Sequence, residues 1–461
     1  MSDKLLIGPK LRRFRNSLGL TQARMAEDLG ISASYLNLIE RNQRAMSAKV
    51  LLKMAGVYDF DISAFSDAGD AQLVASTYEA LRAPRFRDMP VSKNEVEDVV
   101  GISPNIARAF QSVLKTQGTM TTPTDDSSPR AVDIVRDFIQ SNSNYFPEID
   151  ETAEALCEEL GLRRSEPRTA LTERLKSRHD TAVQIVPTNV MPDMLRWFDR
   201  HNQRIHLSEL MSQSSRRFQL AVQIGLLEQR EMFDAHLDRA KITGREARGL
   251  ARTSLANYFA AALLMPYAKF LREAEATRYD VELLSHRFGT SFEQAAHRLT
   301  TLNKPDARGI PFFFLRIDIA GNVSKRFSAG KFAFASQGGA CPIWNIHESF
   351  TDPGRLHTQM VQLPDGATYF SIAKAVKRAG EMHGAPAQRL AIALGCDVSY
   401  APRLCYSKDF NLDEPTPAPI GINCYLCERQ HCRQRAHPPL AKSLMFDERA
   451  RGMSLYRWVP D

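Results

Sequence analysis

Four short segments at the start of the chain carry apolar residues at helical spacing, with polar residues between them. Thr21, Ser32 and Ser47 stand where three of these segments begin, and their hydroxyl groups suit helix N-caps. Gly30 lies between the second and third segments, where a positive φ lets the chain turn sharply, and Ile31 can fill the corner. The segments are residues 7–18, 21–29, 32–40 and 47–55. We therefore predict a head of four helices within residues 1–65.

A connector and a helix-rich region are predicted to follow the head. Residues 66–130 read as a helical connector that ends in a polar linker rich in Thr, Pro, Ser and Asp at Thr116–Arg130. Residues 131–304 read as mostly helical. They include one β-hairpin at Met194–Leu207, where apolar residues alternate on either side of Asp199–Gln203.

The pattern changes from helical to alternating after residue 305. The run IPFFFLRIDIAGNVSKRFSAGKFAFA, which begins at Ile310, alternates apolar and polar residues around an Ala-Gly-Asn turn. Gln359–Leu363 and Ala367–Ala373 are predicted to be further strands. Residues 305–461 are therefore predicted to form an α+β domain with a cysteine-rich tail. The whole chain is predicted to be multidomain and mainly α.

Composition and charge narrow the class of protein. The chain has 461 residues, of which 43% are hydrophobic and 25% charged, so disorder is excluded as a description of the whole chain. The formal net charge is +7, and residues 1–56 supply +6 of it, with ten Lys or Arg against four Asp or Glu. A basic head on a nearly neutral body suggests a polyanionic partner. The chain start has no apolar signal segment and the longest apolar stretch, Leu255–Pro266, is too short to span a membrane, so we expect a cytoplasmic protein.

The run TQARMAEDLGISASYLNLIERNQR in the head resembles the lambda-repressor/Cro-like helix-turn-helix family. The resemblance implies that the helix beginning at Ser32 enters the major groove of double-stranded DNA, with Ala33, Ser34 and Asn37 at base edges. It implies that Gln22 contacts or braces the phosphates. Further phosphate-contact candidates are Lys10, Arg12, Arg13, Arg41, Asn42 and Arg44. The alternative is a small helical domain with a solvated basic face.

The run RRFQLAVQIGLLEQ in the middle region resembles the IrrE/ImmA-like peptidase family, whose helix carries the HExxH motif. The five matching positions are Val222, Gln223, Ile224, Gly225 and Leu226, and Ala262 matches the position of a further acidic ligand. Zinc hydrolysis needs three protein ligands and a carboxylate base, and these positions supply none of the four. We therefore expect no enzyme and no catalytic residues here. His286 and His297 are interpreted as surface or core residues.

Five of the seven cysteines crowd the C-terminal region, whereas Cys157 and Cys341 stand alone. An odd number without a secretory signal argues against a disulfide framework. In GINCYLCERQHCRQRAHPPL, Cys424, Cys427 and Cys432 have a spacing that lets three thiolates converge on one metal centre. The candidates for a fourth ligand are Cys396, Cys405 and, for zinc, His431 or His437, while Arg429, Arg433 and Arg435 would offset the thiolate charge. The alternative is a set of reduced structural cysteines.

The hairpin that follows Ile310 is a candidate site for an anionic small molecule. Phe312–Phe314, with Phe313 at the centre, and Trp344 are its predicted apolar walls. The polar candidates are Arg316, Asn322, Ser324, Lys325 and Arg326. The competing interpretation is a solvated hairpin face.

The order of these parts, with the FFFLRIDIAGNVSKR hairpin and the CxxCERxxC tail, resembles the bacterial short-chain fatty acyl transcriptional regulator family. The resemblance implies a DNA-binding regulator of propionyl-CoA or acetate metabolism that senses a short-chain acyl-CoA. It also implies a 4Fe–4S cluster on Cys396, Cys424, Cys427 and Cys432, with Cys405 in reserve; zinc is the alternative metal. Two other hypotheses are a redox- or iron-sensing transcription factor and a regulatory metallopeptidase. We expect a homodimer or higher homo-oligomer, with Gln72–Lys115 as the dimerisation candidate.

Overall fold

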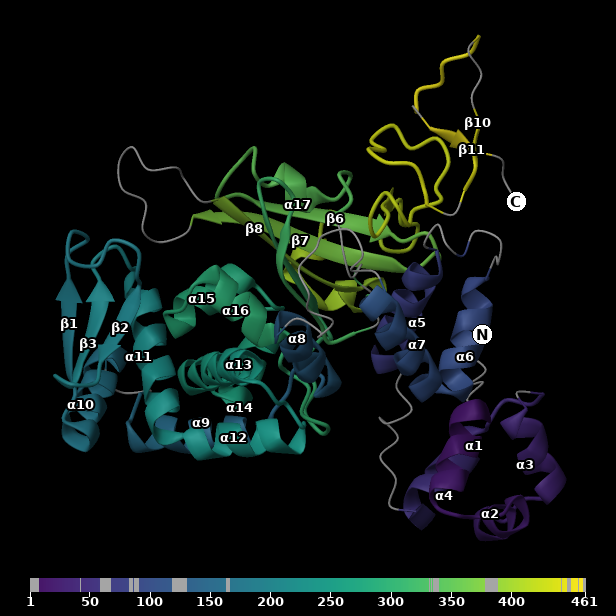
Figure 1. Ribbon diagram of the computed structural model, residues 1–461, viewed down its shortest axis with the longest axis horizontal. Coiled ribbons are helices and arrows are strands. Elements are labelled where there is room, and N and C mark those ends of the chain that lie inside the picture. The colour runs from purple at the N-terminus through teal and green to yellow at the C-terminus, as the bar shows by residue number, and fades with distance from the viewer. Residues whose placement is uncertain are drawn as a thin grey trace. The chain divides into compact units, whose positions relative to one another are not determined.

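The chain forms two compact units in a computed structural model, Met1–Ser127 with Ala333–Ser336, and Ser128–Phe332 with Gln337–Asp461 (Figure 1). Each unit is described by itself. The structure describes residues 8–41, 43–58, 68–82, 86, 91–117, 131–162, 166–330, 332, 334, 340–377, 389–440, 442–445, 449–454 and 456–458. Most of the predicted linker Thr116–Arg130 lies outside these residues.

The head in the first unit consists of the four predicted helices. Thr21 accepts a hydrogen bond from the Arg24 amide at 3.2 Å and Ser32 accepts one from the Tyr35 amide at 3.1 Å, so both predicted caps are confirmed. Gly30 has a φ of 60°, and Ile31 packs at the edge of the head core. The helices are α1 (Gly8–Ser17), α2 (Gln22–Leu29), α3 (Ala33–Glu40) and α4 (Ala48–Tyr58).

Three further helices in the first unit bury a second, smaller core. They are α5 (Ala68–Leu81), α6 (Lys93–Ile102) and α7 (Pro104–Gln117). Val96 and Val100 on α6 pack against Leu73 and Val74 on α5 and Ala107 on α7. A capping box between Ser92 and Glu95 fixes the start of α6.

The second unit begins with a helical part around α13, whose apolar residues are buried along most of its length. Its helices are α8 (Ala131–Ser141), α9 (Pro147–Glu159), α10 (Pro167–His179), α11 (Gln213–Glu228), α12 (Arg230–Arg239), α13 (Arg245–Leu264), α14 (Tyr267–Ala276), α15 (Val281–Phe288) and α16 (Phe292–Leu299). The predicted hairpin is confirmed as β2 (Arg196–Asp199) and β3 (Arg204–Ser208). A strand that we did not predict, β1 (Ala182–Val186), pairs parallel to β3.

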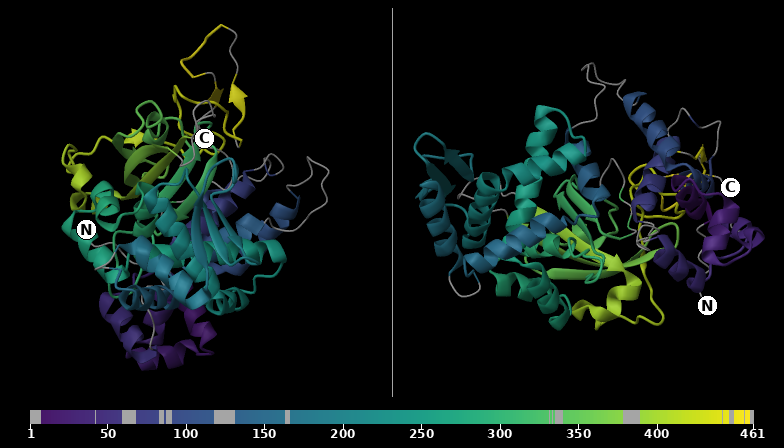
Figure 2. Two further views of the ribbon diagram at one scale, coloured as in Figure 1. Left: turned by 90° about the vertical axis from the view of Figure 1, so that its left-hand side faces the viewer. Right: turned by 90° about the horizontal axis from the view of Figure 1, so that it is seen from below.

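A six-stranded sheet of order β5-β4-β8-β7-β6-β9 forms the rest of the second unit (Figure 2). Its strands are β4 (Phe313–Asp318), β5 (Val323–Ser328), β6 (Leu356–Gln362), β7 (Thr368–Lys377), β8 (Arg389–Asp397) and β9 (Ala418–Pro419). All neighbours are antiparallel except β6 and β9. The short helix α17 (Asn345–Glu348) contacts β6 and β7, and two-residue strands β10 (Leu444–Met445) and β11 (Arg457–Trp458) form a small hairpin. The predicted multidomain, mainly α fold with an α+β C-terminal part is confirmed.

The two faces of this sheet have different cores. On one face, Phe314, Phe370 and Ile392 pack with the apolar residues of α14–α16. On the other face, Phe313 stacks on Phe332 with ring centroids 4.1 Å apart. None of the helices that the structure describes is long and apolar enough to cross a membrane.

Candidate functional site

Helix α3 presents the predicted base-contacting residues on its solvent side. Leu36 and Ile39 bury the opposite side of the helix in the head core. Ala33 and Ser34 are exposed, and Asn37 is half-exposed. The amphipathic pattern of α3 therefore leaves one short polar stripe free to meet the edges of bases in a major groove.

A buried ion pair supports this recognition face. Glu40, at the end of α3, accepts a hydrogen bond from Arg15 Nε of α1 at 2.7 Å. Gln22, at the start of α2, donates from Nε2 to Glu40 Oε2, also at 2.7 Å. The Gln22 side chain is thus oriented from within the head, which suits a group that braces a phosphate.

The phosphate-contact candidates that the structure describes surround α3 and α1. Arg12, Arg41 and Arg44 are exposed. The Arg44 guanidinium lies over the Tyr35 ring, 5.6 Å from its centroid. Asn42 and the side chains of Lys10 and Arg13 lie outside the described residues.

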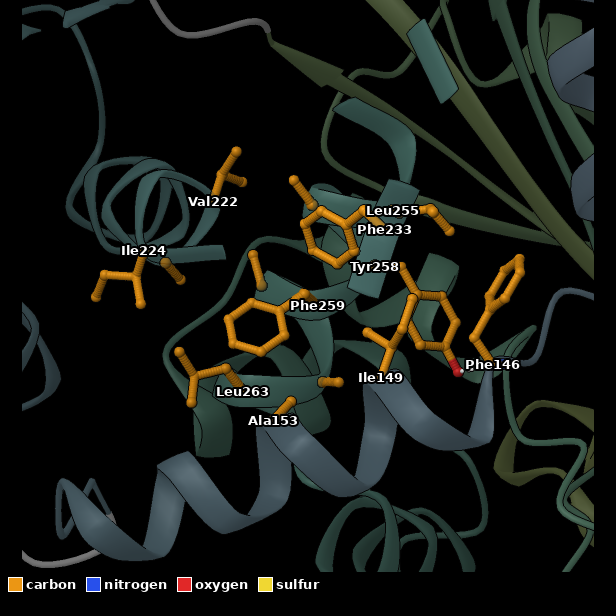
Figure 3. Close-up of a cluster of buried hydrophobic side chains, with 14 of the residues drawn as sticks. Phe146, Ile149, Ala153, Val222, Ile224, Phe233, Leu255, Tyr258, Phe259 and Leu263 are labelled. Carbon is orange, nitrogen blue, oxygen red and sulfur yellow. Dashed lines mark hydrogen bonds between the residues drawn. The ribbon is translucent and has the colours of Figure 1, made fainter. Parts of the chain in front are cut away.

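The positions that match a peptidase motif lie inside an apolar core. Val222 and Ile224 on α11 are buried in the same apolar core as Phe259 and Leu263 on α13 (Figure 3). A Cβ atom on Gly225 would lie 2.8 Å from the Phe259 ring, so α11 and α13 approach closely here. Gln223 and Ala262 are buried as well. The middle domain therefore uses these positions for packing, and their side chains offer no metal ligand.

The two histidines of the middle region lie in different environments, one at the surface and one among aromatic side chains. His286 is exposed near the end of α15. His297 packs edge-on against Phe327, with ring centroids 4.6 Å apart. Burial lowers the pKa of His297 to about 3, so the imidazole is neutral in the folded protein.

The structure does not assemble the predicted anion site at the first hairpin of the sheet. Arg316 donates to Glu293 Oε1 at 2.7 Å, and Lys325 pairs with the same carboxylate at 3.2 Å. Ser324 accepts from Arg316 Nε, and Asn322 donates to Asp318. Glu293 from α16 pairs with both Arg316 and Lys325 and offsets one of their two charges, which weakens them as candidates for binding phosphate.

The predicted apolar walls lie on the opposite face of the sheet from Arg316. Side chains alternate along a strand, so Phe313 and Arg316 on β4 point to different faces. Phe313 packs with Phe332, while Trp344 donates from Nε1 to Ser371 Oγ at 2.9 Å. Arg326 is half-buried on β5. The structure therefore places Phe313 and Trp344 on the other face of the sheet from Arg316.

Three of the predicted cysteines share a small hollow with a fourth that we did not predict. Cys424, Cys427 and Cys432 line this hollow together with Cys341, and we call it the four-cysteine hollow. Burial raises the pKa of the Cys341 thiol, and Cys427 and Cys424 act in the same direction. Backbone groups of Gly421 and Ile343 hydrogen-bond Cys341 and oppose that shift.

The edge of the six-stranded sheet brings Cys341 to this hollow. Just after Cys341, the Asn345 amide donates to Gln359 Oε1 of β6 at 2.8 Å, and Gln359 Nε2 donates to the Ile343 carbonyl at 3.1 Å. Trp344 is tied to Ser371 of β7. These side chains fasten the segment that begins at Cys341 onto β6 and β7.

The same sheet edge holds the loop with the other three cysteines. Strand β9 pairs with β6, and the Ile420 amide donates to the Gln362 carbonyl at 3.0 Å. Arg429 donates from Nη2 to the carbonyls of Gln362 and Leu363, each at 2.8 Å. Cys341 and the cysteine loop, far apart in sequence, are therefore both anchored on β6.

The residues that line the hollow have the chemistry of a metal centre. A Cβ atom on Gly421 would lie 2.7 Å from Cβ and 2.8 Å from Sγ of Cys427, so only glycine leaves room for this thiol. Arg435 is buried beside the hollow and its Nε has no hydrogen-bond partner among the described residues. Four thiols beside a buried cation form a donor set that fits an iron–sulfur cluster or a four-thiolate zinc site.

The four cysteines line one hollow, but they do not form a closed coordination sphere. Among the described residues, no three or more His, Cys, Asp or Glu side chains already converge as a single bound ion requires. All seven cysteines are free thiols. The four cysteines are candidate ligands because they line the same hollow.

Cys396 and Cys405, the two predicted candidates for a fourth thiolate, do not line the four-cysteine hollow. Cys396 is buried on β8 opposite Phe370, on the face that packs against α14–α16. Burial raises the pKa of the Cys405 thiol to about 11, and it lies beside Asp280 and Tyr406. Neither histidine alternative lines the hollow: His431 is exposed, and His437 stacks on Tyr425.

Comparison with known proteins covers almost the whole chain. A model of the short-chain fatty acyl coenzyme A regulator C-terminal domain matches residues 301–456. An IrrE N-terminal-like domain matches residues 176–300, and a helix-turn-helix matches residues 11–65. The three matches follow one another in the order that the sequence resemblance implied.

Similar proteins of full length are transcriptional regulators. A propionyl-CoA carboxylase regulator of Cereibacter sphaeroides is 39% identical, and the match covers 100% of both chains. The HTH-type transcriptional regulator PrpR of Mycobacterium tuberculosis is 36% identical over 97% of this chain and 94% of that protein. A solved Mycobacterium tuberculosis transcriptional regulator is 40% identical with a TM-score of 0.67, covering 70% of this chain and 98% of the other. The chain therefore belongs to the family of short-chain fatty acyl coenzyme A regulators and is a helix-turn-helix, DNA-binding transcriptional regulator.

Proposed function

We propose that the chain controls genes of short-chain acyl-CoA metabolism, of the propionyl-CoA or acetate type, and that a short-chain acyl-CoA is its effector. The observation that carries this proposal is the full-length likeness to a propionyl-CoA carboxylase regulator. The effector would shift the population between arrangements that bind the operator strongly and weakly. We do not place the effector site at the hairpin of β4 and β5, because Arg316 and Lys325 already form ion pairs with Glu293 there.

The proposed role of the middle domain is to support regulation by binding and not by catalysis. Val222, Leu226 and Ala262 stand where a zinc peptidase needs its three ligands, and Gln223 stands where it needs its base. Phe259 and Leu263 pack against this part of α11. A metallopeptidase function is therefore the weakest of the three hypotheses.

We further propose that Cys341, Cys424, Cys427 and Cys432 hold a 4Fe–4S cluster, with zinc as the alternative. An iron–sulfur cluster would supply a one-electron redox centre whose potential responds to neighbouring charge and hydrogen bonds. Arg435 lies buried next to the thiols and would offset the negative charge of a four-thiolate centre. Arg429 would keep the loop on β6.

The proposed DNA-bound form is a homodimer. Helix-turn-helix modules read paired half-sites about one helical turn apart, which requires two heads. The small core of α5, α6 and α7 directly follows the head in sequence and is the proposed dimerisation segment. Sedimentation velocity of the full chain tests this part, and a monomer that remains monomeric on a single operator would contradict it.

The proposal is tested on operators selected from genomic DNA fragments by the full chain. Binding is then measured by fluorescence anisotropy with propionyl-CoA, acetyl-CoA or free coenzyme A present. We expect at least one acyl-CoA to shift the operator affinity about fivefold or more, which is a usual allosteric coupling. An affinity that no short-chain acyl-CoA changes would contradict the proposed effector and leave DNA binding intact.

Two variants separate reading of bases from contact with phosphates. Asn37→Ala should cost about 1–3 kcal/mol and relax selectivity at one base pair. Arg44→Ala should weaken all sequences alike and lower the salt dependence of binding by about one phosphate contact. Leu18→Ala, an exposed position at the end of the first helical region, serves as the control that should change neither property.

Redox or iron sensing is the second candidate function, and one observation favours it. Cys424 and Cys432 are only partly buried, so an oxidant can reach the proposed centre. Operator affinity should then differ between the anaerobic protein and the same protein after exposure to air. Equal affinities of a brown, iron-loaded protein and its oxidised form would contradict this sensing function.

A further inference from the structure

The last described part of the chain packs against the cysteine loop, residues 420–436, and has almost no buried core of its own. We call residues 437–458 the tail. Strands β10 and β11 pair over only two residues each. Among the described tail residues only Pro439 and Trp458 are buried. A two-stranded hairpin of this size is not stable alone, so the tail needs support from elsewhere.

That support comes from the residues between and around the cysteines. The Tyr425 ring stacks on His437 with centroids 4.5 Å apart, and the Tyr425 carbonyl accepts from the Leu440 amide at 3.0 Å. Both tail residues therefore contact the residue that follows Cys424. The position of the first tail residues therefore depends on the position of the cysteine loop.

Arg435 makes the second link, between the hollow and the end of the tail. It donates to the Cys424 carbonyl at 3.1 Å and to the Arg429 carbonyl at 2.8 Å. Its guanidinium also lies over the Trp458 ring, 4.7 Å from the centroid. One buried side chain thus contacts a residue of the thiol group and the buried aromatic anchor of the tail.

Apart from the hydrogen bonds of Ile420 and Arg429 at the end of β6, the cysteine loop has no regular structure to hold it. Residues 420–436 contain turns and bends but no helix and no strand. Loops of this kind obtain their stability from a bound metal, because the free energy of metal binding is also free energy of folding. The tail therefore rests on the loop, and the loop rests on the centre that its thiols would bind.

We infer that the tail is a metal-dependent structural element: it folds against the cysteine loop when the four-cysteine centre is intact and is released when that centre is lost, with Arg435 and Trp458 as the positioning pair. This inference rests on the proposed metal centre. It gives the centre an output that does not require a contact with DNA. Loss of metal changes the accessibility of a defined segment at the end of the chain.

Limited trypsin digestion of the full chain, with cleavage sites mapped by mass spectrometry, tests this inference. The tail carries exposed sites at Arg449 and Arg451. We expect these sites in the anaerobically purified, metal-loaded protein to be cut at least about tenfold more slowly than in the chelator-stripped protein, because cleavage follows the population of the open form. Equal rates in the two forms would overturn the inference while the metal content upholds the proposed centre.

Two variants test the positioning pair without removing a thiol. Trp458→Leu removes the aromatic anchor, and we expect unchanged metal content with tail cleavage about as fast as in the stripped protein. Arg435→Gln should give the same faster cleavage, whereas Arg433→Gln, at an exposed position two residues earlier, should behave as wild type. Protected tails in both Trp458→Leu and Arg435→Gln would overturn the role of the pair. A wild-type chain that holds no metal after anaerobic reconstitution would instead overturn the proposed centre, and this inference with it.

Discussion

Arg15 of α1 and Glu40 of α3 form a buried ion pair at the base of the DNA-recognition helix. Arg15 Nε lies 2.7 Å from Glu40 Oε1, and the side chains are 11% and 2% exposed. Arg15 Nη1 also donates to the Leu20 carbonyl at 2.8 Å. The pair therefore joins α1 and α3 to the turn before α2.

Removing one partner of this pair should unfold much of the head. Glu40→Ala leaves the Arg15 charge buried without its carboxylate, and breaking such a pair costs about 3–5 kcal/mol. A domain of this size has about that much stability in total. We expect fast amide hydrogen exchange throughout α1–α4 and loss of operator binding.

The matched control for Glu40→Ala is an ion pair on the surface of the same head. Arg24 pairs with Glu27 at 3.1 Å, and both side chains are more than half exposed. Glu27→Ala, which removes this exposed pair and leaves the pair of Arg24 with Asp28 in place, should cost at most about 0.5 kcal/mol, because solvent screens exposed pairs. A head that tolerates both substitutions equally would contradict the importance assigned to the buried pair.

The close approach of α11 and α13 predicts a difference between two helical glycines. Gly225→Ala places a methyl group 2.8 Å from the Phe259 ring. The forced shift should cost about 1–3 kcal/mol of unfolding free energy, as overpacking does elsewhere. Gly249→Ala on α13 meets no atom within 4 Å and should raise stability by up to about 1 kcal/mol through helix propensity. Urea denaturation of both variants compares them, and a Gly225→Ala protein as stable as wild type would contradict this packing.

Acid should destabilise the second unit partly through His297. Burial lowers the pKa of this imidazole to about 3, from a usual value of 6.5. The unfolded chain therefore binds the proton more readily, so stability falls as the pH drops below about 6.5. The charged groups that face His297 are Lys325, Glu293, Arg298 and Arg316. The pKa of Glu293 is also lowered, so its contribution is lost only at more acidic pH than that of His297.

The His297 effect is measured as the slope of unfolding free energy against pH. Between pH 6.5 and pH 5, His297→Gln should reduce this slope by up to about 1.4 kcal/mol per pH unit, which corresponds to one proton. His286→Gln, at an exposed position on α15, should leave the slope unchanged. Identical slopes for wild type and His297→Gln would show that the imidazole is not held neutral by the fold.

Local features of the fold could be predicted from the sequence, because local chemistry determines them. Thr21 and Ser32 cap the helices that their positions suggested, and the hairpin of β2 and β3 follows its alternating pattern. The strand β1 could not be found in this way, since its pairing partner β3 lies more than fifteen residues further on. Pairing between distant segments has no local signal in one sequence.

The candidate sites also show the difference between features that local sequence predicts and features that depend on contacts between distant segments. Cys424, Cys427 and Cys432 are close in sequence, and in the structure they line one hollow. Cys341 stands alone in the sequence, and only the packing of its segment on β6 brings it to the other three. For the hairpin site, strand alternation alone would have separated Phe313 from Arg316. The carboxylate of Glu293 that pairs with Arg316 comes from a distant helix and had no signal near the hairpin.

We propose that Cys341, and not Cys396, completes a metal centre with Cys424, Cys427 and Cys432. Iron, zinc and acid-labile sulfide per chain, measured after anaerobic purification of wild type, Cys341→Ser and Cys396→Ser, test it most directly. We predict a stoichiometric centre in wild type and in Cys396→Ser, and its loss in Cys341→Ser. A Cys341→Ser protein that keeps the full metal content while Cys396→Ser loses it would contradict the claim.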